Sequence, residues 1–554
     1  MPAPNAAALL RRNAAEPSIA ARPAVRFEDK VWTHAQYVEQ SCRWANWLLG
    51  RTWAGPRHLG LLLDNVPEYL FAFGGAAMAG ATVVGLNHTR RGDALLRDVH
   101  HTHVGVIVTE PGHTELLAPI AGRLGVDVLV VGSSLEEALA GSSADDPGLE
   151  PDPSTPWALI FTSGTSDAPK AVICSQRRII VTGVRMSITM DVGPDDVGYV
   201  AMPLFHSNAV MVGWAPSLVT GASVGLARRF TASGWLADIR RYGATYFNYT
   251  GKPLSYLLAT PERPDDADNP LRVAFGNEGS PQVVTTFARR FGVQVIDAFG
   301  ATEGGVAVQR TDAMPEGAMG LVGEAVKVVD EDGRERPRAD FDAHGRLVNA
   351  DECVGEIVNT AGVGPFEGYY NNPEANERTT RFGWYWSGDL GYVDEAGYLY
   401  FAGRNAEWLR VDGENFPAGP IEAVLSRHPD VVIAAVYGVP DEQAGDQVMA
   451  ALILGDGASF DPDGFAAWID GQADIGPKWR PRYVRVASEL PATATNKVLK
   501  RTLVHQKFRA DRTGGDALWV RGRGEDAYRP FTADDEAALR DRFVAAGREP
   551  FWDL

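Results

Sequence analysis

The sequence predicts an α/β protein: a large N-terminal domain of layered α/β subdomains with a small β-rich subdomain, then a small α+β C-terminal domain. Apolar strand-like runs alternate with helical stretches over residues 25–135, a pattern typical of parallel sheets covered by helices. A second such pattern runs from Val181 to about Ala307. From Gly320 to Tyr400 the chain changes to short strands with Gly and Asp turns, which indicates the β-rich subdomain. Residues after Gly403 form the last α+β unit, which we expect to end near Val504.

The bulk composition narrows the function classes. The 554 residues carry a formal net charge of −19 and no basic stripe, so nucleic acid is not an expected partner. The cysteines, Cys42, Cys174 and Cys353, are too far apart for a metal-ligand spacing, and we expect a reducing, cytoplasmic setting. The segment from Met1 to Ala24 lacks a continuous apolar core, so we expect no signal peptide.

The apolar segment Tyr69–Leu86 has no charge over 18 residues, a length at which a membrane span has to be considered. Gly74, Gly75 and Gly80 interrupt it, and Thr82–Leu86 has the character of a strand. We therefore predict a buried helix, a glycine turn and a strand, and peripheral membrane contact stays open.

A polar loop follows the apolar strand Trp157–Phe161. This loop, Thr162–Lys170, offers hydroxyl donors, a glycine that lets backbone N–H groups converge on an anion, and a terminal lysine. Alone it also fits an ordinary surface loop, and Lys170 follows Pro169 rather than the glycine of a P-loop. The predicted phosphate-binding residues are Thr162, Ser163, Gly164, Thr165, Ser166 and Lys170.

Further polar stretches follow this loop, and each alone has an ordinary structural explanation. A single histidine is most often a satisfied core residue, and Glu303 or Lys497 alone fits a solvated surface charge. Together with the phosphate loop, in this order, they are a far more specific signal. The stretches are Pro203–His206, Asp297–Gly304, Trp386–Asp389, Gly403–Asn415 and Pro491–Lys500.

In this combination the chain resembles the adenylate-forming superfamily, which includes acyl-CoA synthetases, aryl-CoA ligases, peptide-synthetase adenylation domains and firefly luciferase. The resemblance covers about residues 25–504. The runs Tyr242–Thr245, Asn248–Tyr249, Val273–Asn277 and Lys500–Lys507 look like the branch of fatty-acid transport and very-long-chain acyl-CoA synthetases. The resemblance implies an N-terminal domain at 1–403, a hinge at 404–406 that includes Ala406, and a mobile C-terminal domain at 407–554 with a tail from about residue 505.

The resemblance also implies the chemistry and the cofactors ATP, Mg²⁺ and CoA. A carboxylate attacks the α-phosphorus of ATP, pyrophosphate leaves, and the acyl-adenylate then forms a thioester with CoA. Such phosphoryl chemistry needs mainly positioning and charge neutralisation. By resemblance, the catalytic residues are Lys497, Thr302, Glu303 and His206, with Thr302 on the α-phosphate, Glu303 on Mg²⁺ and Lys497 bridging the carboxylate and α-phosphate.

The remaining site residues are likewise assigned by resemblance. Gly276, Asn277, Asp297, Ala298 and Phe299 line the adenine slot, Gly300 joins the nucleotide-binding set, and Asp389 with Arg404 nearby binds the ribose. The acyl-pocket residues are Asn208, Val210, Trp214, Tyr249, Thr250, Gly279 and Gly304, and Gly413 and Asn415 lie on the CoA side.

The surroundings of His206 indicate the kind of acid. Amino-acid-activating relatives place an acid here to pair the substrate ammonium, whereas this chain has no Asp or Glu between Val197 and Ala237. An unpaired buried ammonium is costly, so we expect a carboxylic acid without an α-amine. The predicted acyl pocket suits a fatty acid and a bulky polycyclic acid equally.

Departures from the family pattern leave a second function open. Asp167 replaces a common glycine in the phosphate loop, and Asn496 replaces one before Lys497. At the hinge, Ala406 stands where relatives often carry a charged pivot, and Asp412 precedes Gly413 on the predicted CoA side. The alternative is an enzyme that forms the acyl-adenylate but passes it to a carrier protein or a second ligase.

A serine hydrolase is a more remote alternative, since Gly221–Gly225 matches the pattern G-x-S-x-G around Ser223. A nucleophile elbow needs a strand before the serine and a helix after it, and the order expected here is the reverse. The sequence leaves open whether the chain forms a homodimer.

Overall fold

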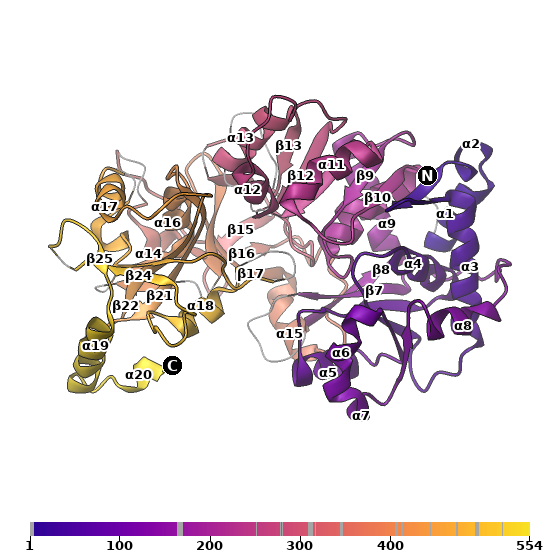
Figure 1. Ribbon diagram of the computed structural model, residues 1–554, viewed down its shortest axis with the longest axis horizontal. Coiled ribbons are helices and arrows are strands. Elements are labelled where there is room, and N and C mark those ends of the chain that lie inside the picture. The colour runs from indigo at the N-terminus through magenta and orange to yellow at the C-terminus, as the bar shows by residue number, and fades with distance from the viewer. Residues whose placement is uncertain are drawn as a thin grey trace. The chain divides into compact units, whose positions relative to one another are not determined.

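The computed structural model describes residues 5–553 apart from 163–169, 251, 278, 280, 309–313, 316, 344–346, 405–407, 412–413, 444, 473–474, 494–497 and 523. The chain divides into two compact units (Figure 1). Unit 1 comprises Met1–Asn277, Val284–Gly304 and Pro365–Arg378, and unit 2 comprises Glu278–Val283, Gly305–Gly364 and Thr379–Leu554.

The first sheet of unit 1 has six strands in the order β6-β5-β3-β4-β7-β8. Its strands are β3 (His58–Leu62), β4 (Thr82–Gly85), β5 (Val106–Thr109), β6 (Asp127–Val130), β7 (Pro156–Thr162) and β8 (Lys170–Ser175). All neighbours are parallel except β7 and β8, which pair antiparallel. Every residue of β3, β4 and β5 is buried, as the continuous apolar runs predict for a parallel sheet. The parallel pairing predicted for the apolar runs between residues 25 and 135 is confirmed.

Helix α4 (Pro67–Ala79) accounts for the apolar segment considered as a membrane span. It packs on α3 (His34–Gly50), where a Cβ added at Gly75 would lie 2.4 Å from the Cβ of Trp44. The helix ends at Gly80, whose φ of 62° is the left-handed conformation that glycine adopts easily. The predicted buried helix, turn and strand are confirmed. Within the described residues, we find no helix with the length and apolar character that a membrane crossing requires.

The second sheet of unit 1 has seven strands in the order β13-β12-β11-β9-β10-β1-β2. They are β1 (Pro23–Phe27), β2 (Lys30–Thr33), β9 (Val197–Val200), β10 (Ser223–Leu226), β11 (Tyr246–Thr250), β12 (Val273–Asn277) and β13 (Gln294–Asp297). Only β1 and β2 pair antiparallel. Trp235 of α11 (Ala232–Tyr242) meets the rings of Phe287 and Phe291 of α13 (Pro281–Phe291), with centroids 5.6 and 5.0 Å apart.

The remaining helices of unit 1 join or cover these sheets. They are α1 (Ala6–Ala15), α2 (Pro17–Ala20), α5 (Gly92–His101), α6 (Thr114–Leu117), α7 (Ala121–Leu124), α8 (Ser134–Ala140), α9 (Gln176–Met190), α10 (Ala215–Thr220), α12 (Lys252–Ala259) and α15 (Pro373–Thr379). Short 3₁₀ helices span Pro111–His113 and Ala118–Ile120.

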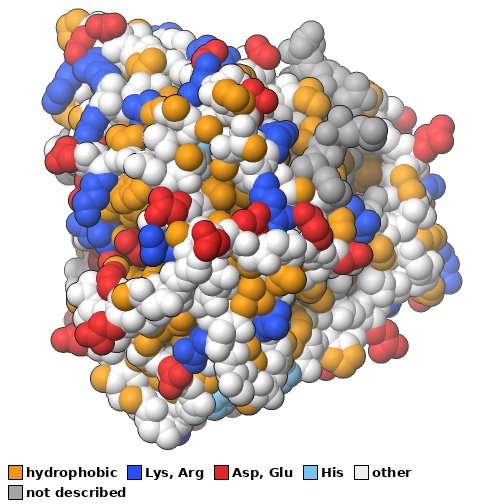
Figure 2. Space-filling view, turned by 90° about the vertical axis from the view of Figure 1, so that its right-hand side faces the viewer, with side chains coloured by type: hydrophobic (Ala, Val, Ile, Leu, Met, Phe, Trp, Pro, Cys, Tyr) orange, Lys and Arg blue, Asp and Glu red, His pale blue; other side chains and the backbone are white. Residues whose placement is uncertain are grey.

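The connector that leads into β7 runs along the surface of unit 1, as its Ser, Asp and Pro content predicts. Arg11 of α1 forms an ion pair with Asp146 at 2.6 Å, and Asn46 of α3 donates to the carbonyl oxygens of Ser143 and Asp145. On the face of the molecule in Figure 2, acidic and basic side chains are interspersed rather than gathered by sign.

Unit 2 contains the β-rich subdomain that the sequence predicts, an antiparallel sheet with the order β14-β18-β17-β16-β15. Its strands are β14 (Ala318–Leu321), β15 (Val326–Val329), β16 (Gly355–Asn359), β17 (Tyr385–Val393) and β18 (Tyr398–Arg404), with α14 (Ala350–Cys353) and a 3₁₀ turn at Arg381–Gly383 between them.

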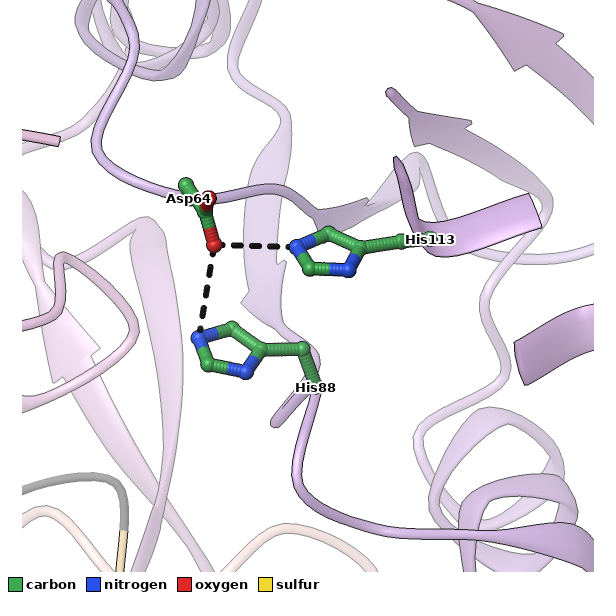
Figure 3. A group of neighbouring side chains, drawn as sticks. All are labelled: Asp64, His88 and His113. Atoms are coloured by element: carbon green, nitrogen blue, oxygen red, sulfur yellow. Dashed lines mark hydrogen bonds and ion pairs between the residues drawn. The ribbon is translucent and has the colours of Figure 1, made fainter. Parts of the chain in front are cut away.

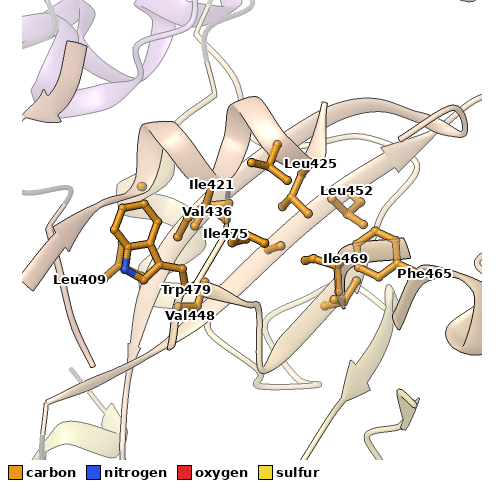
Figure 4. Packing of buried hydrophobic residues seen from close by; sticks show 14 of the residues in the cluster. Leu409, Ile421, Leu425, Val436, Val448, Leu452, Phe465, Ile469, Ile475 and Trp479 are labelled. Carbon is orange, nitrogen blue, oxygen red and sulfur yellow. The ribbon is translucent and has the colours of Figure 1, made fainter. Parts of the chain in front are cut away.

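The rest of unit 2 is an α+β layer with the sheet order β21-β22-β23-β24-β25. The strands of this sheet are β21 (Val431–Pro440), β22 (Asp446–Leu454), β23 (Tyr483–Val486), β24 (Ala517–Val520) and β25 (Arg529–Pro530). A separate two-stranded hairpin, β19 (Trp408–Val411) and β20 (Glu414–Pro417), precedes it in the chain. Its helices are α16 (Ala418–Leu425), α17 (Pro462–Asp470), a 3₁₀ turn at Pro477–Trp479, α18 (Lys500–Gln506), α19 (Ala533–Ala545) and α20 (Pro550–Asp553). Figure 4 shows Ile421 and Leu425, Phe465 and Ile469, and Trp479 meeting in its core.

The expected end of this unit near Val504 is wrong, because β24 pairs with β23 and extends the same sheet. The segment after residue 505 packs on the unit rather than standing apart from it. Tyr528 belongs to the core cluster, and Phe508 and Phe531 meet the ring of Tyr483 at 5.0 and 5.8 Å. Lys507 is 2% exposed and donates to the carbonyl oxygen of Phe551 at 2.7 Å. This hydrogen bond holds helix α20 against the segment that follows α18.

Candidate active site

The hairpin β7–β8 presents the two ends of the predicted phosphate loop. Thr162 and Lys170 are register partners at the end of the hairpin where the loop joins the two strands. The predicted loop residues Ser163, Gly164, Thr165, Ser166 and Asp167 lie outside the described residues. The Thr162 hydroxyl donates to Glu303 Oε1 at 3.4 Å, and Lys170 Nζ lies 5.4 Å from the ring centre of Tyr369. Both ends of the loop therefore lie beside one polar group of unit 1.

Thr302 and Glu303 are the centre of this group, in the irregular segment that follows β13. The hydroxyls of Thr302 and Ser207 are 2.7 Å apart, and the Tyr369 hydroxyl donates to Glu303 Oε1 at 2.8 Å. The structure thus brings Thr162 to the consecutive residues Thr302 and Glu303, although Thr162 and Glu303 are 141 positions apart in the sequence. Carboxylate and hydroxyl oxygens of this kind are the donor set that Mg²⁺ prefers.

Arg178, in the first turn of α9, holds the backbone of this segment. Its guanidinium donates to the carbonyl oxygens of Ile173, at 2.8 Å, of Glu303, at 2.9 Å, and of Thr302. The side chain is buried at 7% exposure, so these bonds are made away from water, where they are costly to lose. Glu367 fixes the start of the same helix by accepting from the N–H and the hydroxyl of Ser175 at 2.7 and 2.6 Å.

Tyr369 reaches Glu303 because its segment runs along β8. The N–H of Ile173 donates to the carbonyl of Gly368 at 2.9 Å, and the N–H of Tyr370 donates to that of Ala171 at 2.8 Å. Sequence reasoning missed Arg178, Ser207 and Tyr369. The position of Ser207 beside His206 and the aromatic pair Tyr369-Tyr370 after a glycine are signals for two of them, whereas nothing in the sequence marks Arg178.

A chain of hydrogen bonds links part of the predicted acyl pocket to the predicted adenine slot. Asn208 begins a π-helix, Asn208–Trp214, a rare conformation that often occurs at functional sites. Its amide donates to the carbonyl oxygen of Tyr249 at 3.1 Å and accepts from Asn248 at 2.7 Å. The Tyr249 hydroxyl donates to Asp297 Oδ2 at 2.8 Å.

The neighbouring strands β11 and β12 lie close together where they end. A Cβ added at Gly276 would lie 2.3 Å from the carbonyl oxygen of Tyr249, so only glycine fits there. The N–H of Ala298 donates to the Gly276 carbonyl at 2.8 Å and fixes the start of Ala298–Gly300. Asn277 Oδ1 is buried and has no hydrogen-bond partner in the described part of the chain. A buried acceptor without a partner fits a site that a donor from a ligand completes.

His206 follows β9 beside the ring of Phe205, with ring centres 5.1 Å apart. His206 is half-buried. The atoms packed around its ring remove water from the imidazole, and this burial lowers the pKa of His206 to about 4. The imidazole is therefore neutral at neutral pH and adds no positive charge.

The other predicted acyl-pocket residues are less clustered. Val210 and Trp214 are buried in the core, where Trp214 meets Phe73 and Trp157 with ring centres 5.2 and 5.6 Å away. The Thr250 hydroxyl lies 3.8 Å from the sulfur of Met202. Gly304 has a φ of 69°, in the left-handed region that favours glycine, while Gly279 is described without either neighbour.

The predicted ribose-binding residues belong to unit 2. Asp389 of β17 is 5% exposed and stands opposite Arg404 of β18 in the strand register. Its N–H donates to the Ser387 hydroxyl at 3.1 Å. The backbone of Arg404 and of Asn415 is described but their side chains are not, and Lys497, Asn496, Ala406, Asp412 and Gly413 lie outside the described residues.

Ser223 is not a nucleophile at a strand-to-helix turn. It begins β10 and follows α10, the reverse of the order that a hydrolase elbow needs, and its hydroxyl donates to the carbonyl oxygen of Pro23 at 2.6 Å. The geometry therefore speaks against the hydrolase alternative.

Comparisons with known proteins show the family to which the chain belongs. Residues 10–370 match the family described as "AMP-binding enzyme", and residues 420–497 match "AMP-binding enzyme C-terminal domain". The chain is 46% identical to a steroid-22-oyl-CoA synthetase of Rhodococcus jostii over 540 residues, 96% of both chains. It is 47% identical to the medium/long-chain-fatty-acid–CoA ligase FadD17 of Mycobacterium marinum, over 89% of this chain and 95% of the relative.

A solved structure shows the same fold at lower identity. The anthranilate CoA ligase AuaEII, in complex with anthranoyl-AMP, is 23% identical, with a TM-score of 0.79 over 90% of this chain and 96% of that one. The chain therefore belongs to the AMP-binding, adenylate-forming enzyme family and is one of its acyl-CoA synthetases.

Proposed function

We propose that this enzyme activates a large apolar carboxylic acid, of the fatty-acyl or steroid side-chain class, and that the Thr162–Thr302–Glu303 group binds the phosphates of ATP. The reaction uses ATP and CoA: the acid becomes an acyl-adenylate and then a thioester. The residue assignment rests on where the two ends of the phosphate loop lie: Thr162 contacts Glu303, and Lys170 lies over the ring of Tyr369, whose hydroxyl donates to Glu303.

Glu303, with the Thr162 hydroxyl beside its carboxylate and Thr302 preceding it in the chain, is the proposed Mg²⁺ site. The ion supplies charge neutralisation at the β- and γ-phosphate oxygens. Tyr369 orients the Glu303 carboxylate through its hydrogen bond, and Arg178 fixes the backbone on which Thr302 and Glu303 are carried. Lys170 and the loop hold the departing pyrophosphate, and Lys497 neutralises charge between the carboxylate and the α-phosphate.

The adenine base is proposed to lie against Gly276. The buried oxygen of Asn277, which has no hydrogen-bond partner among the described residues, can accept from the exocyclic amine of adenine. Asp297 lies at the end of the same sheet, where its carboxylate accepts from Tyr249. Asp389 is proposed to bind both ribose hydroxyls, because a carboxylate can accept two such bonds.

Two observations favour an apolar acid without an amine. The neutral His206 and the absence of Asp or Glu between Val197 and Ala237 provide no partner for an ammonium group. The relatives at 46% and 47% identity are named for a steroid acid and for medium- and long-chain fatty acids. An acid of either class buries a large apolar surface, worth about 25 cal/mol per Å².

CoA is the proposed acyl acceptor, and a carrier protein or second ligase is the alternative that the sequence departures raise. The naming of both close relatives as CoA enzymes favours CoA. Measuring pyrophosphate exchange and CoA-thioester formation side by side tests this choice. Thioester turnover that keeps pace with adenylation supports CoA, and fast exchange with negligible thioester contradicts it.

The substrate proposal is tested by trapping acyl-adenylates with hydroxylamine over a panel of acids, with and without CoA. The panel contains medium- and long-chain fatty acids, steroid side-chain acids, small aromatic acids and amino acids. We expect hydroxamates from the first two groups. Activity confined to amino acids or small aromatic acids would contradict the proposal. A cytoplasmic setting is proposed as well, since Cys42, Cys174 and Cys353 are all free thiols.

A further inference from the structure

Asp64, His88 and His113 form a compact group at one edge of the first sheet. Asp64 follows β3, His88 follows β4, and His113 ends the 3₁₀ helix after β5. Strand β3 pairs in parallel with both β4 and β5, so the carboxyl ends of three neighbouring strands meet here. The proposed adenylation chemistry uses none of these residues.

The donor atoms of the three side chains converge on a small volume. Figure 3 shows both imidazoles directed at the Asp64 carboxylate: His113 Nε2 lies 3.0 Å and His88 Nε2 3.7 Å from Asp64 Oδ1. One ligand atom from each residue lies within 4.8 Å of the other two. A tetrahedral Zn²⁺ with bonds of about 2.0–2.1 Å sets its donors about 3.3 Å apart. The two nitrogen–oxygen distances lie on either side of that separation.

Hydrogen bonding explains only half of this arrangement. His113 donates to the Asp64 carboxylate at normal distance, but 3.7 Å is too long for a hydrogen bond from His88. In the part of the chain that the structure describes, the His88 ring makes no hydrogen bond. It instead lies nearly parallel to the His113 ring, at 10° and 5.0 Å between centres. Two imidazoles stacked beside one carboxylate present two nitrogen donors and one oxygen donor to the same point.

Neighbouring groups hold these three side chains in place. Glu110 accepts from the N–H of Asp64 at 2.7 Å and pairs with Arg228 at 2.6 Å, while Arg228 lies 3.7 Å from the second oxygen of Asp64. Outer groups of this kind orient metal ligands. The ring of His88 also meets Phe205 edge to face, with centres 5.3 Å apart, so the group supports the residue that precedes His206.

We propose that Asp64, His88 and His113 bind one divalent transition-metal ion, with Zn²⁺ as the best match to two imidazoles and one carboxylate. The side chains are 15–25% exposed, which leaves the fourth position to water. The donor set differs from that of the proposed Mg²⁺ site at Glu303, because imidazole selects zinc-like ions and oxygen-only sites select Mg²⁺. Its role is structural: the ion ties together the ends of β3, β4 and β5 and supports Phe205.

The experiment uses the full-length protein after treatment with a chelator and titrates it with Zn²⁺ alone, with Mg²⁺ present in excess. We expect one tightly bound Zn²⁺ per chain, a rise in the melting temperature, and an X-ray absorption spectrum with two imidazole ligands. His88→Gln and His113→Gln should each weaken Zn²⁺ binding by at least about tenfold, as ligand-shell changes do.

His505→Gln is the matched control, because His505 is an exposed histidine outside the group. It should bind Zn²⁺ like the unaltered protein. The proposal is overturned if no stoichiometric binding occurs, if Mg²⁺ competes effectively, or if the His88 and His113 variants bind as tightly as the control. If these variants fail to fold, as judged by circular dichroism, the absorption spectrum of the zinc-loaded natural chain decides: fewer than two imidazole ligands overturns the proposal.

Discussion

Arg178 donates a hydrogen bond of 2.9 Å to the backbone carbonyl of Glu303, and the same nitrogen also donates to the carbonyl of Thr302. A buried cation therefore holds the backbone of the two residues that we propose to contact the α-phosphate and Mg²⁺. The charge itself faces carbonyl oxygens rather than the ligand site. Arg178 is a positioning residue, and its loss should alter the rate of adenylation more than the affinity for substrates.

Arg178→Met keeps the apolar stem and removes the guanidinium. We expect the rate constant of adenylation to fall about a hundredfold, as displacements near 1 Å do, with a small change in KM. The unpaired carbonyls should also lower the free energy of unfolding by about 1–3 kcal/mol. Pyrophosphate exchange and chemical denaturation measure the two effects. Arg177→Met, at the exposed neighbouring position, should change neither; equal effects of the two substitutions would contradict the assignment.

Tyr369→Phe removes the hydroxyl that donates to Glu303 Oε1 at 2.8 Å. Because this bond orients the carboxylate, the Mg²⁺ concentration needed for half-maximal activity should rise about 10–100-fold. The control is Tyr370→Phe, which loses a bond to the exposed His103 instead. An unchanged Mg²⁺ requirement in Tyr369→Phe would show that Glu303 does not depend on this contact.

The sequence predicts the elements of this protein better than it predicts the contacts between them. The buried parallel strands and helix α4 follow from continuous apolar runs and a glycine stop, which are local properties. Strand β24 was missed because it has only four residues and stands between turns, so its pairing with β23 is visible only in the folded chain.

Contacts made by charged side chains were the hardest to predict. Arg178 lies in a helix with charged neighbours, and its burial depends on a loop 124 residues later. The Asp64–His88–His113 group likewise depends on the strand order β5-β3-β4, which brings together three separate connections. The motif residues Thr162, Thr302 and Glu303 could be named from the sequence because their order is a family pattern, although their roles stay predictions.

The titration of His206 gives a pH prediction. Burial lowers its pKa from 6.5 to about 4, so the unfolded chain binds a proton below pH 6.5 that the folded chain does not bind until about pH 4. This difference favours the unfolded state as the pH falls through that window. His206→Gln should therefore lose less thermal stability than the natural chain between pH 7 and about pH 4.5. If the melting temperatures of His206→Gln and of the natural chain change equally with pH, the depressed pKa of His206 is contradicted.

Asp389→Ala should weaken ATP and AMP binding alike, by about tenfold or more, because both nucleotides carry the ribose and charged hydrogen bonds are worth about 1.5–3 kcal/mol. Isothermal titration with each nucleotide measures this effect. Asp332→Ala, at an exposed turn of the same subdomain, is the control and should bind normally. Unchanged affinity in Asp389→Ala would refute the ribose assignment.

The central claim is that Lys497 serves the adenylation step, and separating the two half-reactions of Lys497→Ala tests it most directly. Acyl-adenylate formation from acid and ATP should fall at least about 10²–10³-fold, as the loss of one charge-stabilising contact does. Thioester formation from supplied acyl-adenylate and CoA should stay close to that of the natural enzyme and of the exposed-site control Lys478→Ala. An equal loss of both half-reactions, or normal adenylation without the lysine, would contradict the account.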